Sequence, residues 1–350
     1  MTKRATSALV AGLVAAVALL AAGCGGSSSD AAGTTAATTG TTGATPIKVG
    51  LTTDVGELND NGFNELAYNG LKRAERELGV QGRVVESKSS ADYVPNMSAL
   101  ARQGYNLIIG VGFAQGDAIA KAALRYPNTK FAIVDVDHAD LKGKPANVQG
   151  LLFREQEVGY LVGYLAALEA KRGGANQISA VGGFKQPPVD RYIAGYRAGA
   201  QAAVPGIVVK WGYSQDWDDQ AKCKELALNQ IAAGSKVIFQ VAGGCGLGAL
   251  LAAKQRNVWG IGVDADQSFL GPHVLTSALK GVDSAVFLTA KAVQEGTFKG
   301  GGNAVFGLDQ EGVGLGTFSP KANKADIAKV KKIEQQIADG TITGIPTTVK

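Results

Sequence analysis

The chain has 350 residues, of which 45% are hydrophobic and 19% are charged. This composition is typical of a globular protein with one large domain or two medium-sized ones. The formal net charge is +5, and removal of Lys3 and Arg4 with the leader described next leaves 33 basic against 30 acidic side chains, or +3. Such a balance excludes the strongly basic surface of a nucleic-acid-binding protein, so no nucleic-acid partner is expected.

The first 24 residues have the layout of an export signal. A basic pair precedes the apolar segment 5–20, which is followed by the sequence AAGC, ending at Cys24. The apolar segment is short for a membrane span. The small residues before the cysteine resemble the lipobox of bacterial lipoproteins, although Ala21 stands where leucine is usual. We therefore expect residues 1–23 to be a cleaved signal peptide and Cys24 to carry lipid; the alternative is an ordinary signal with an incidental cysteine.

Residues 24–45 form a low-complexity segment. After Cys24 it contains only Gly, Ser, Ala and Thr, apart from Asp30. Such a composition cannot bury a core and behaves as a flexible tether. Together with the lipid, it predicts a protein anchored to the cell membrane on the extracytoplasmic face.

From residue 47 onward, short β-branched runs alternate with amphipathic helices. In the first half, strands are expected at Ile47–Leu51, Arg83–Glu86, Leu107–Val111, Lys130–Val134 and Val148–Phe153, with helices near Gly62–Leu78, Asn96–Gln103 and Gln115–Arg125. After a helix from Gln156 to Lys171 the pattern restarts, with strands at Ile178–Val181, Val208–Trp211, Val237–Val241 and Val258–Val263, and helices near Asp190–Ala203, Gln220–Ala233 and Gly248–Gln255. This order predicts an α/β protein with two doubly wound, mostly parallel sheets.

The two sheets define two predicted lobes, residues 46–153 and 154–273. The remaining segments are expected to recross between the lobes, with 274–298 returning to the first lobe and 303–350 to the second. These segments hold expected strands at Val274–Leu279 and Ala304–Leu308, and expected helices around Ser284–Gln294 and Lys324–Asp339. A cleft between two such lobes is the default ligand site.

One stretch suggests where that cleft lies. The sequence KVGLTTDVGELNDNGFNE, from Lys48 to Glu65, is a strand followed by a polar loop and the start of a helix. In open α/β sheets, ligands lie over the carboxyl ends of the strands. We therefore expect Asp54, Phe63 and Asn64 to point into the cleft.

Several sequence blocks resemble the basic membrane protein family, the purine-nucleoside-receptor-like substrate-binding lipoproteins of ABC importers. The blocks are TTDVGELNDNGFNELAYNGL, IIGVGFAQGDAIAKAALRYPNTKFAIVDVD, FREQEVGYLVGYLAALEA, VGGFKQPPVDRYIAGYRAGAQ, VIFQVAGGCGLGALLAA, GIGVDADQ and VLTSALKGVDSAV. They cover nearly everything after the tether, in the order typical of the family. The chain departs from the family at Gly62, where serine is common.

The resemblance implies a type I periplasmic-binding-protein fold with a hinge, and a nucleoside bound between the lobes. The base would stack on aromatic rings, and carboxylates and a lysine would hold the ribose. Binding of solute for an ABC permease requires no cofactor and no catalytic residue, and we expect a monomer. The candidate ligand-binding residues are Asp54, Phe63, Asn64, Phe113, Asp135, Trp217, Gly243, Gly244, Asp264 and Lys280.

The chemistry of these residue types fits a nucleoside. Phe63 has a π-face on which a base can stack, and the amide of Asn64 can pair with a purine edge. Asp135 and Asp264 each end an apolar strand, one in each predicted lobe, and a carboxylate can accept two hydroxyl hydrogen bonds. Trp217 is a candidate for the second face of the base, and Lys280 for a hydroxyl donor.

Each of these residues also has a purely structural interpretation. Phe63 could be a core residue in the first turn of a helix, and Asn64 a helix cap. The aspartates could cap helices or lie in solvated loops, an interpretation that fits Asp137 and Asp266 better than Asp135 and Asp264. Lys280 could be a solvated surface lysine.

Two motifs suggest rival chemistry. Gly244, Gly246 and Ala249 match the dinucleotide pattern G-x-G-x-x-A, with Asp264 near the position of a ribose-binding acid. The motif lies late in the chain, and an exported protein is separated from the cytoplasmic cofactor pool, so an NAD-type enzyme is the weaker hypothesis. A receptor for a sugar or an amino acid on the same fold stays open, since fold alone does not choose the ligand. The second motif is the DVDHAD run that begins at Asp135, which resembles a phosphatase aspartate pair or a cation-binding loop. It lacks the usual Thr or Val four residues after Asp135, and it does not match the spacing of an EF-hand calcium loop, so a hydrolase is not favoured.

No metal site or histidine-based catalytic triad is indicated. The two histidines, His138 and His273, are far apart in sequence and lack Cys or His neighbours at metal-binding spacing. We expect neither a metal nor a catalytic residue.

Cys223 and Cys245 are predicted to form a disulfide. Cys223 lies in the first turn of an expected helix, and Cys245 lies in the loop after the strand Val237–Val241. In a βαβ unit the helix begins at the edge where both flanking strands end, so the two cysteines fall at the same edge of the second sheet. Disulfides persist in exported proteins. The alternative is two unpaired thiols.

Overall fold

The computed structural model describes residues 46–56 and 58–349. The predicted signal peptide (1–23), the predicted tether (24–45) and the predicted lipid-bearing Cys24 lie outside the described residues. Within the described ranges, no helix is long and apolar enough to cross a membrane.

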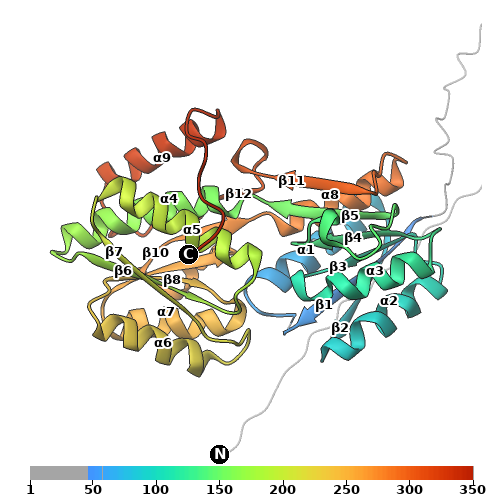
Figure 1. The fold of residues 1–350 in the computed structure, drawn as a ribbon, viewed down its shortest axis with the longest axis horizontal. Coiled ribbons are helices and arrows are strands. Elements are labelled where there is room, and N and C mark those ends of the chain that lie inside the picture. The colour runs from blue at the N-terminus through green and yellow to red at the C-terminus, as the bar shows by residue number, and fades with distance from the viewer. Residues whose placement is uncertain (1–45, 57, 350) are drawn as a thin grey trace, which may run out of the picture. The chain divides into compact units, whose positions relative to one another are not determined.

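The first sheet contains six parallel strands in the order β11-β5-β4-β3-β1-β2. The strands are β1 (Lys48–Val55), β2 (Gln81–Ser87), β3 (Leu107–Gly110), β4 (Lys130–Val134), β5 (Val148–Phe153) and β11 (Gly302–Phe306). The central strand β3 is a continuous apolar run because helices cover both of its faces. Helices α1 (Phe63–Leu78) and α8 (Val282–Gln294) pack together on one face, and α2 (Tyr93–Arg102) and α3 (Gly116–Arg125) on the other (Figure 1).

The second sheet repeats this arrangement with one reversed strand, in the order β12-β10-β9-β8-β6-β7. The strands are β6 (Gln177–Gly182), β7 (Val208–Tyr213), β8 (Val237–Val241), β9 (Trp259–Asp264), β10 (Val274–Lys280) and β12 (Val313–Leu315), and β12 is antiparallel to β10. Helices α4 (Glu155–Arg172) and α5 (Pro187–Ala203) pack against each other, as do α6 (Gln220–Ala232) and α7 (Gly246–Gln255), and α9 (Lys324–Ala338) packs against α4. The predicted architecture of two doubly wound α/β sheets is confirmed.

Short 3-10 helices follow several strand ends. They are η1 (Ser90–Asp92), η2 (Phe113–Gln115), η3 (His138–Asp140), η4 (Gly243–Cys245), η5 (Ser268–Leu270) and η6 (Leu308–Gln310). Each of η2 and η4 leads directly into a helix, α3 and α7 respectively, so the chain turns sharply at the carboxyl edge of each sheet.

The predicted return of the C-terminal segments is wrong for two strands. Residues 274–298 were expected to join the first lobe, but β10 pairs with β9 in the second sheet, and only α8 packs against the first lobe's α1. Residues 303–350 were expected to join the second lobe, but β11 pairs with β5 in the first sheet. The sheet to which a strand belongs is fixed by its hydrogen-bonded neighbour, which the order of elements along the chain does not specify.

Helices α4 and α5 cross with their backbones in close contact. Both carry glycines four residues apart, in the sequences GYLVG and GYRAG. A Cβ atom at Gly163 would lie 2.0 Å from the backbone oxygen of Tyr196, and one at Gly199 would lie 1.9 Å from that of Tyr160. Only glycine fits there, and the contact fixes α5 on its sheet.

Candidate functional site

A cavity lies where the carboxyl ends of strands from both sheets face each other. Asp54 of β1 and Asp135 after β4 line it from the first sheet, and Val241 of β8, Asp264 of β9 and Lys280 of β10 line it from the second. The unfilled space is about 670 Å³, including the mouth that opens to solvent.

All of the predicted ligand-binding residues line this cavity. They are Asp54, Phe63, Asn64, Phe113, Asp135, Trp217, Gly243, Gly244, Asp264 and Lys280. Their place in the cavity fits the predicted binding role, which stays a prediction.

The two strand-ending aspartates have the same backbone conformation. Asp135 has φ +73° and Asp264 has φ +62°, the left-handed region that Asp tolerates better than most residues. In contrast, Asp137 and Asp266 have local structural roles. Asp137 accepts a hydrogen bond from Ala139 N at 2.8 Å and caps η3. Asp266 accepts hydrogen bonds from Ser268 N and Thr317 N, each at 3.1 Å, and so ties two loops together.

Lys280 is buried and ion-paired. Its ammonium group lies 2.6 Å from Asp135 Oδ1 and 2.8 Å from Asp135 Oδ2, and 3.0 Å from Glu155 Oε1. It also lies 5.1 Å from the centre of the Phe63 ring and 4.9 Å from that of Phe153. Only 2% of the side chain is exposed, which excludes the alternative of a solvated surface lysine. Lys280 thus joins a strand of the second sheet to the strand-ending carboxylate of the first.

Asp264 is a buried carboxylate of the cavity that is held by a tyrosine. The hydroxyl of Tyr192 donates to its Oδ1 at 3.3 Å. Burial raises the pKa of Asp264 to about 7, with the negative charges of Asp135 and Asp60 adding to the effect and Lys280 opposing it. Near neutral pH, the carboxyl group of Asp264 is therefore present in two forms: an ionised form that only accepts hydrogen bonds, and a protonated form that can also donate one.

This raised pKa predicts how stability depends on pH. Because the folded-state pKa exceeds that of the unfolded chain, near 3.9, the contribution of neutral Asp264 is fully present below that value and is lost as pH rises through about 7. Asp264→Asn removes the titration. The free energy of unfolding of the parent should therefore fall relative to this variant between about pH 4 and pH 7, as measured by urea unfolding across that range.

The matched control is Asp117→Asn, on the exposed surface of α3. Because this side chain is exposed, the substitution should change the free energy of unfolding by no more than about 0.5 kcal/mol. A stability difference between Asp264→Asn and the parent that stays flat between about pH 4 and pH 7 would contradict the raised pKa of Asp264.

The loop before α1 is held by Asp60, which the sequence prediction did not include. Its carboxylate accepts hydrogen bonds from the backbone N–H groups of Gly62 at 2.9 Å, Asn64 at 2.9 Å and Glu65 at 3.2 Å. Asp60 therefore has the helix-capping role that was the structural alternative for Asn64. It places Phe63 and Asn64 at the cavity wall.

Asp54 is held by Tyr93, the first residue of α2. The Tyr93 hydroxyl donates to Asp54 Oδ1, and the backbone N–H of Val55 donates to the same oxygen at 2.7 Å. Burial raises the pKa of Asp54, and these hydrogen bonds oppose the shift.

Trp217 forms part of the opposite wall. A Cβ atom at Gly183 would lie 2.3 Å from the indole ring, and the Phe184 ring centre is 5.4 Å away, tilted by 51°. The backbone oxygen of Trp217 accepts a hydrogen bond from Cys245 N at 2.7 Å. The indole therefore packs closely on the chain after β6, and its backbone is tied to the loop after β8.

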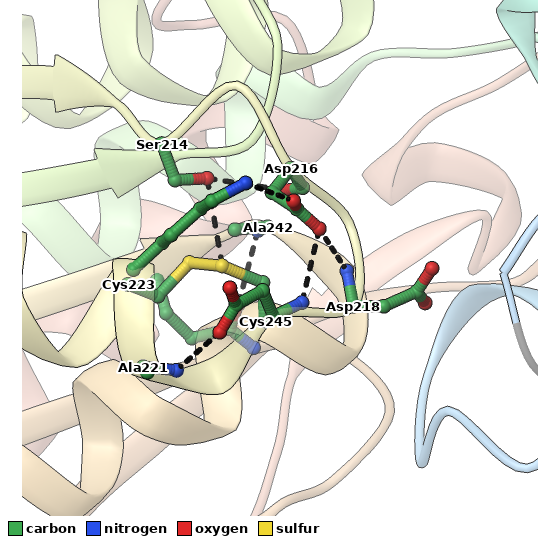
Figure 2. Close-up of a disulfide and its surroundings, with 10 residues drawn as sticks. Ser214, Asp216, Asp218, Ala221, Cys223, Ala242 and Cys245 are labelled. Atoms are coloured by element: carbon green, nitrogen blue, oxygen red, sulfur yellow. Dashed lines mark hydrogen bonds and ion pairs between the residues drawn. A yellow bond between two sulfur atoms is a disulfide. The ribbon is translucent and has the colours of Figure 1, made fainter.

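Cys223 and Cys245, the two cysteines expected to pair, form a disulfide with Cα atoms 5.6 Å apart. Figure 2 shows the bridge beside the loop that carries Ser214, Asp216 and Asp218. Asp216 accepts hydrogen bonds from Asp218 N at 2.9 Å and from Lys222 Nζ at 2.6 Å. These bonds, and above all that from Asp219 N, lower the pKa of Asp216. The bridge thus fastens the start of α6 to the glycine loop of the cavity.

Loss of the bridge should destabilise the protein. The two cysteines are 22 residues apart, and closing a loop of this length contributes about 3 kcal/mol in the chain-entropy model. The variant with both Cys223→Ser and Cys245→Ser should lose about that much free energy of unfolding, as measured by urea unfolding. A reductant should lower the stability of the parent and leave that of the double variant unchanged. Full alkylation of both thiols in denatured, non-reduced parent protein would show that no bridge forms.

The N-terminal end of α5 and the residue before it supply cavity residues that the sequence prediction missed. Gln186, Pro188, Val189 and Tyr192 line the cavity. The helix begins at Pro187, three residues before the predicted start at Asp190, because proline is tolerated in the first turn of a helix. The available signal was the place of this turn directly after a strand end.

The described residues hold no group of three or more His, Cys, Asp or Glu side chains arranged to bind a metal ion. The polar groups of the cavity are instead carboxylates, amides and one ammonium group among aromatic rings. Such a set can bind a polar organic solute through hydroxyl hydrogen bonds and stacking.

Two doubly wound sheets, joined by crossing segments and enclosing a cavity at their facing strand ends, define a two-lobed solute-binding protein with the type I periplasmic-binding-protein fold. Residues 47–345 match the family described as ABC transporter substrate-binding protein PnrA-like. The chain belongs to this family.

Relatives and a solved structure agree with this assignment. The chain is 35% identical to a CD4+ T-cell-stimulating antigen of Listeria monocytogenes, over 97% of this chain and 98% of that protein. It is 34% identical to the ABC transporter nucleoside-binding protein BmpA of Lactococcus lactis, over 85% of this chain and 89% of that protein. The crystal structure of an ABC transporter solute-binding protein from Aeropyrum pernix superimposes with a TM-score of 0.77 at 31% identity, covering 86% of this chain and 94% of that one. The chain is therefore an ABC transporter substrate-binding protein.

Proposed function

We propose that this protein captures a purine nucleoside between its lobes and delivers it to an ABC permease, without catalysing a reaction. One observation carries the proposal. Aromatic rings and strand-ending carboxylates from both sheets, among them Phe63, Asp135 and Asp264, line the same cavity. The relative from Lactococcus lactis that is named for nucleoside binding supports the same substrate class.

Each part of a nucleoside has a matching group in the cavity. Vicinal ribose hydroxyls donate to the carboxylates of Asp135 and Asp264, while the base stacks on Phe63 from one lobe and Trp217 from the other. The Asn64 amide offers a donor and an acceptor to the edge of the base. A solute that contacts both lobes stabilises their closed arrangement by its differential affinity, so closure about the crossing segments accompanies binding.

We further propose that lipid on Cys24 anchors the protein to the extracytoplasmic face of the cell membrane, with residues 24–45 as a tether. The supporting observation is the sequence itself: a basic pair, an apolar segment and small residues that end at a cysteine. Radiolabelled palmitate incorporated into the parent and absent from Cys24→Ser would support the anchor.

A thermal-shift panel tests the substrate class. A ligand that binds only the native state raises stability by RT ln(1 + [L]/Kd). Adenosine, guanosine and inosine should each raise the melting temperature, whereas arabinose, glucose, amino acids and NAD should not. A shift produced only by a sugar, an amino acid or NAD would overturn the nucleoside proposal. Mass spectrometry of small molecules carried through purification gives an independent reading.

Phe63→Ala should weaken nucleoside binding while the protein stays folded. Stacking of a base on an aromatic ring contributes about 1–3 kcal/mol in nucleic-acid binders, so the dissociation constant should rise about tenfold or more. The measurement is isothermal titration calorimetry with the nucleoside that gives the largest thermal shift. The control is Phe269→Ala, because Phe269 is 63% exposed and lies outside the cavity lining. Equal affinities in both variants would remove Phe63 from the site.

A further inference from the structure

Four charged side chains, those of Arg191, Glu155, Lys280 and Asp135, form a series of ion pairs that joins the two sheets. We call this series the ion chain. Arg191 Nε lies 2.6 Å from Glu155 Oε2, and Glu155 Oε1 lies 3.0 Å from Lys280 Nζ. Lys280 in turn lies 2.6 Å from Asp135 Oδ1. The formal charges alternate in sign along the ion chain and sum to zero. Arg191 belongs to α5, Glu155 begins α4, Lys280 ends β10, and Asp135 follows β4.

Only one end of this ion chain reaches the ligand cavity. Lys280 and Asp135 line the cavity, whereas Glu155 and Arg191 do not. Glu155 is fully buried and Arg191 is 19% exposed. The three donors of the Lys280 ammonium group match its three short contacts, two to Asp135 and one to Glu155.

The ion chain determines how strongly the ammonium group of Lys280 binds the carboxylate of Asp135. While Arg191 neutralises Glu155, Lys280 can direct two of its contacts to Asp135. Without Arg191, Glu155 would be a buried carboxylate whose remaining cation partner is Lys280, so it would compete with Asp135 for the ammonium group. The carboxylate that faces the cavity would then lose part of its orientation and of its charge stabilisation.

We propose that Glu155 and Arg191 are positioning residues, which set the orientation and the ionised state of Asp135 for the ligand through Lys280 without touching the ligand. This inference rests on the proposed function, because the ligand concerned is the nucleoside. It assigns a binding role to a pair that the cavity lining alone would leave out.

The ionisation of Asp135 reports on this role. The charged groups that face it are Lys280 from β10, Glu155 from α4, Arg191 from α5 and Asp264 from β9. Burial raises the pKa of Asp135, and the positive charges of Lys280 and Arg191 oppose that shift. Removal of Arg191 should therefore raise the pKa of Asp135 further. Ligand binding, which weakens when Asp135 is protonated, should then begin to weaken at a higher pH; we call this part of the pH profile the acid limb.

The test compares Arg191→Met with Arg191→Lys and with the control Arg197→Met. Arg197 lies on the same helix, with its guanidinium 4.2 Å from the centre of the Trp211 ring, and is not part of the ion chain. Two quantities are measured from about pH 5 to pH 8: the dissociation constant of inosine by calorimetry, and the carboxyl ¹³C shift of Asp135 in the ligand-free protein. Circular dichroism confirms folding.

Arg191→Met should bind about tenfold more weakly at pH 7, and both the pH below which binding weakens and the Asp135 titration should move to higher pH. Arg191→Lys keeps the charge but loses one of the two guanidinium contacts with Glu155, Nε to Oε2 at 2.6 Å and Nη2 to Oε1 at 3.5 Å. It should bind a few-fold more weakly without that displacement, and Arg197→Met should match the parent. Weaker binding without a displaced titration in Arg191→Met would mean a purely structural role and would overturn the inference, as would unchanged binding.

Two further outcomes are also decisive. If Arg191→Met does not fold, Arg191→Gln takes its place, with the same expected displacement of the Asp135 titration and the same outcomes that overturn the inference. If the parent binds no nucleoside at all, the proposed function fails. The inference is then judged on the ligand-free titration alone, in which an unmoved Asp135 signal in Arg191→Met would overturn it.

Discussion

Replacing Lys280 with methionine is expected to weaken nucleoside binding about 100-fold and to destabilise the fold by about 3–5 kcal/mol. Methionine keeps most of the apolar stem but removes the charge that lies between Asp135 and Glu155. Two buried carboxylates would then face each other with Arg191 as the remaining cation of the ion chain. Calorimetry gives the affinity, and urea unfolding gives the stability. The stability loss should shrink at acid pH, because protonation neutralises the carboxylates.

The control for Lys280 is an exposed lysine with a carboxylate partner. Lys291 lies 3.8 Å from Glu295 one turn away on α8, and its side chain is 46% exposed. Because exposed pairs are screened by solvent, Lys291→Met should change stability by less than about 1 kcal/mol and leave binding unchanged. Comparable losses in both variants would show that burial of Lys280 is not the cause.

Gly199→Ala is expected to destabilise the protein by at least about 2 kcal/mol, although it adds a single methyl group. The new Cβ atom would lie 1.9 Å from the backbone oxygen of Tyr160, and a backbone atom cannot rotate away as a side chain can. Helices α4 and α5 would have to separate. Because the first turn of α5 lines the cavity, ligand affinity should fall as well. Urea unfolding and calorimetry measure the two effects.

Gly302→Ala is the matched control. This glycine lies in β11, and a Cβ atom added there meets nothing within 4 Å. The variant should stay within about 0.5 kcal/mol of the parent. A Gly199→Ala variant as stable as Gly302→Ala would mean that the two helices can move apart at little cost.

Most helices and strands could be predicted from the sequence, because the hydrophobic pattern within each segment and the residues that end it indicate the same type of element. Buried strands such as β3 and β8 are short apolar runs with β-branched residues, and glycine and polar residues end them. The pairing of β10 and β11 could not be predicted in this way. Each pairs with one of two sheets that have similar apolar patterns, and the choice depends on contacts between distant parts of the chain. The short strand β12 carries too few residues to show a period.

The residues of the candidate site could likewise be predicted where a local pattern marks them, but their contacts with distant residues could not. Asp135 and Asp264 were predicted because each ends an apolar strand, where open α/β sheets bind ligands. The Lys280–Asp135 contact joins residues 145 positions apart, and no local pattern announces it. Likewise, the sequence analysis singled out neither Glu155, which begins α4, nor its partner Arg191, which lies within the helix predicted at Asp190–Ala203. Ion pairs between separate elements depend on tertiary packing, which a single sequence does not show.

The pairing of β11 with β5 has a consequence for the order in which the chain can fold. Residues 302–306 complete a sheet whose other strands lie within residues 48–153, so this contact spans about half of the chain. Contacts of such long range are slow to form. A nascent or truncated chain that ends before residue 302 leaves the backbone of β5 unpaired along one edge, and an open apolar edge promotes aggregation. The first lobe therefore becomes safe from misassembly only after nearly the whole polypeptide has been made.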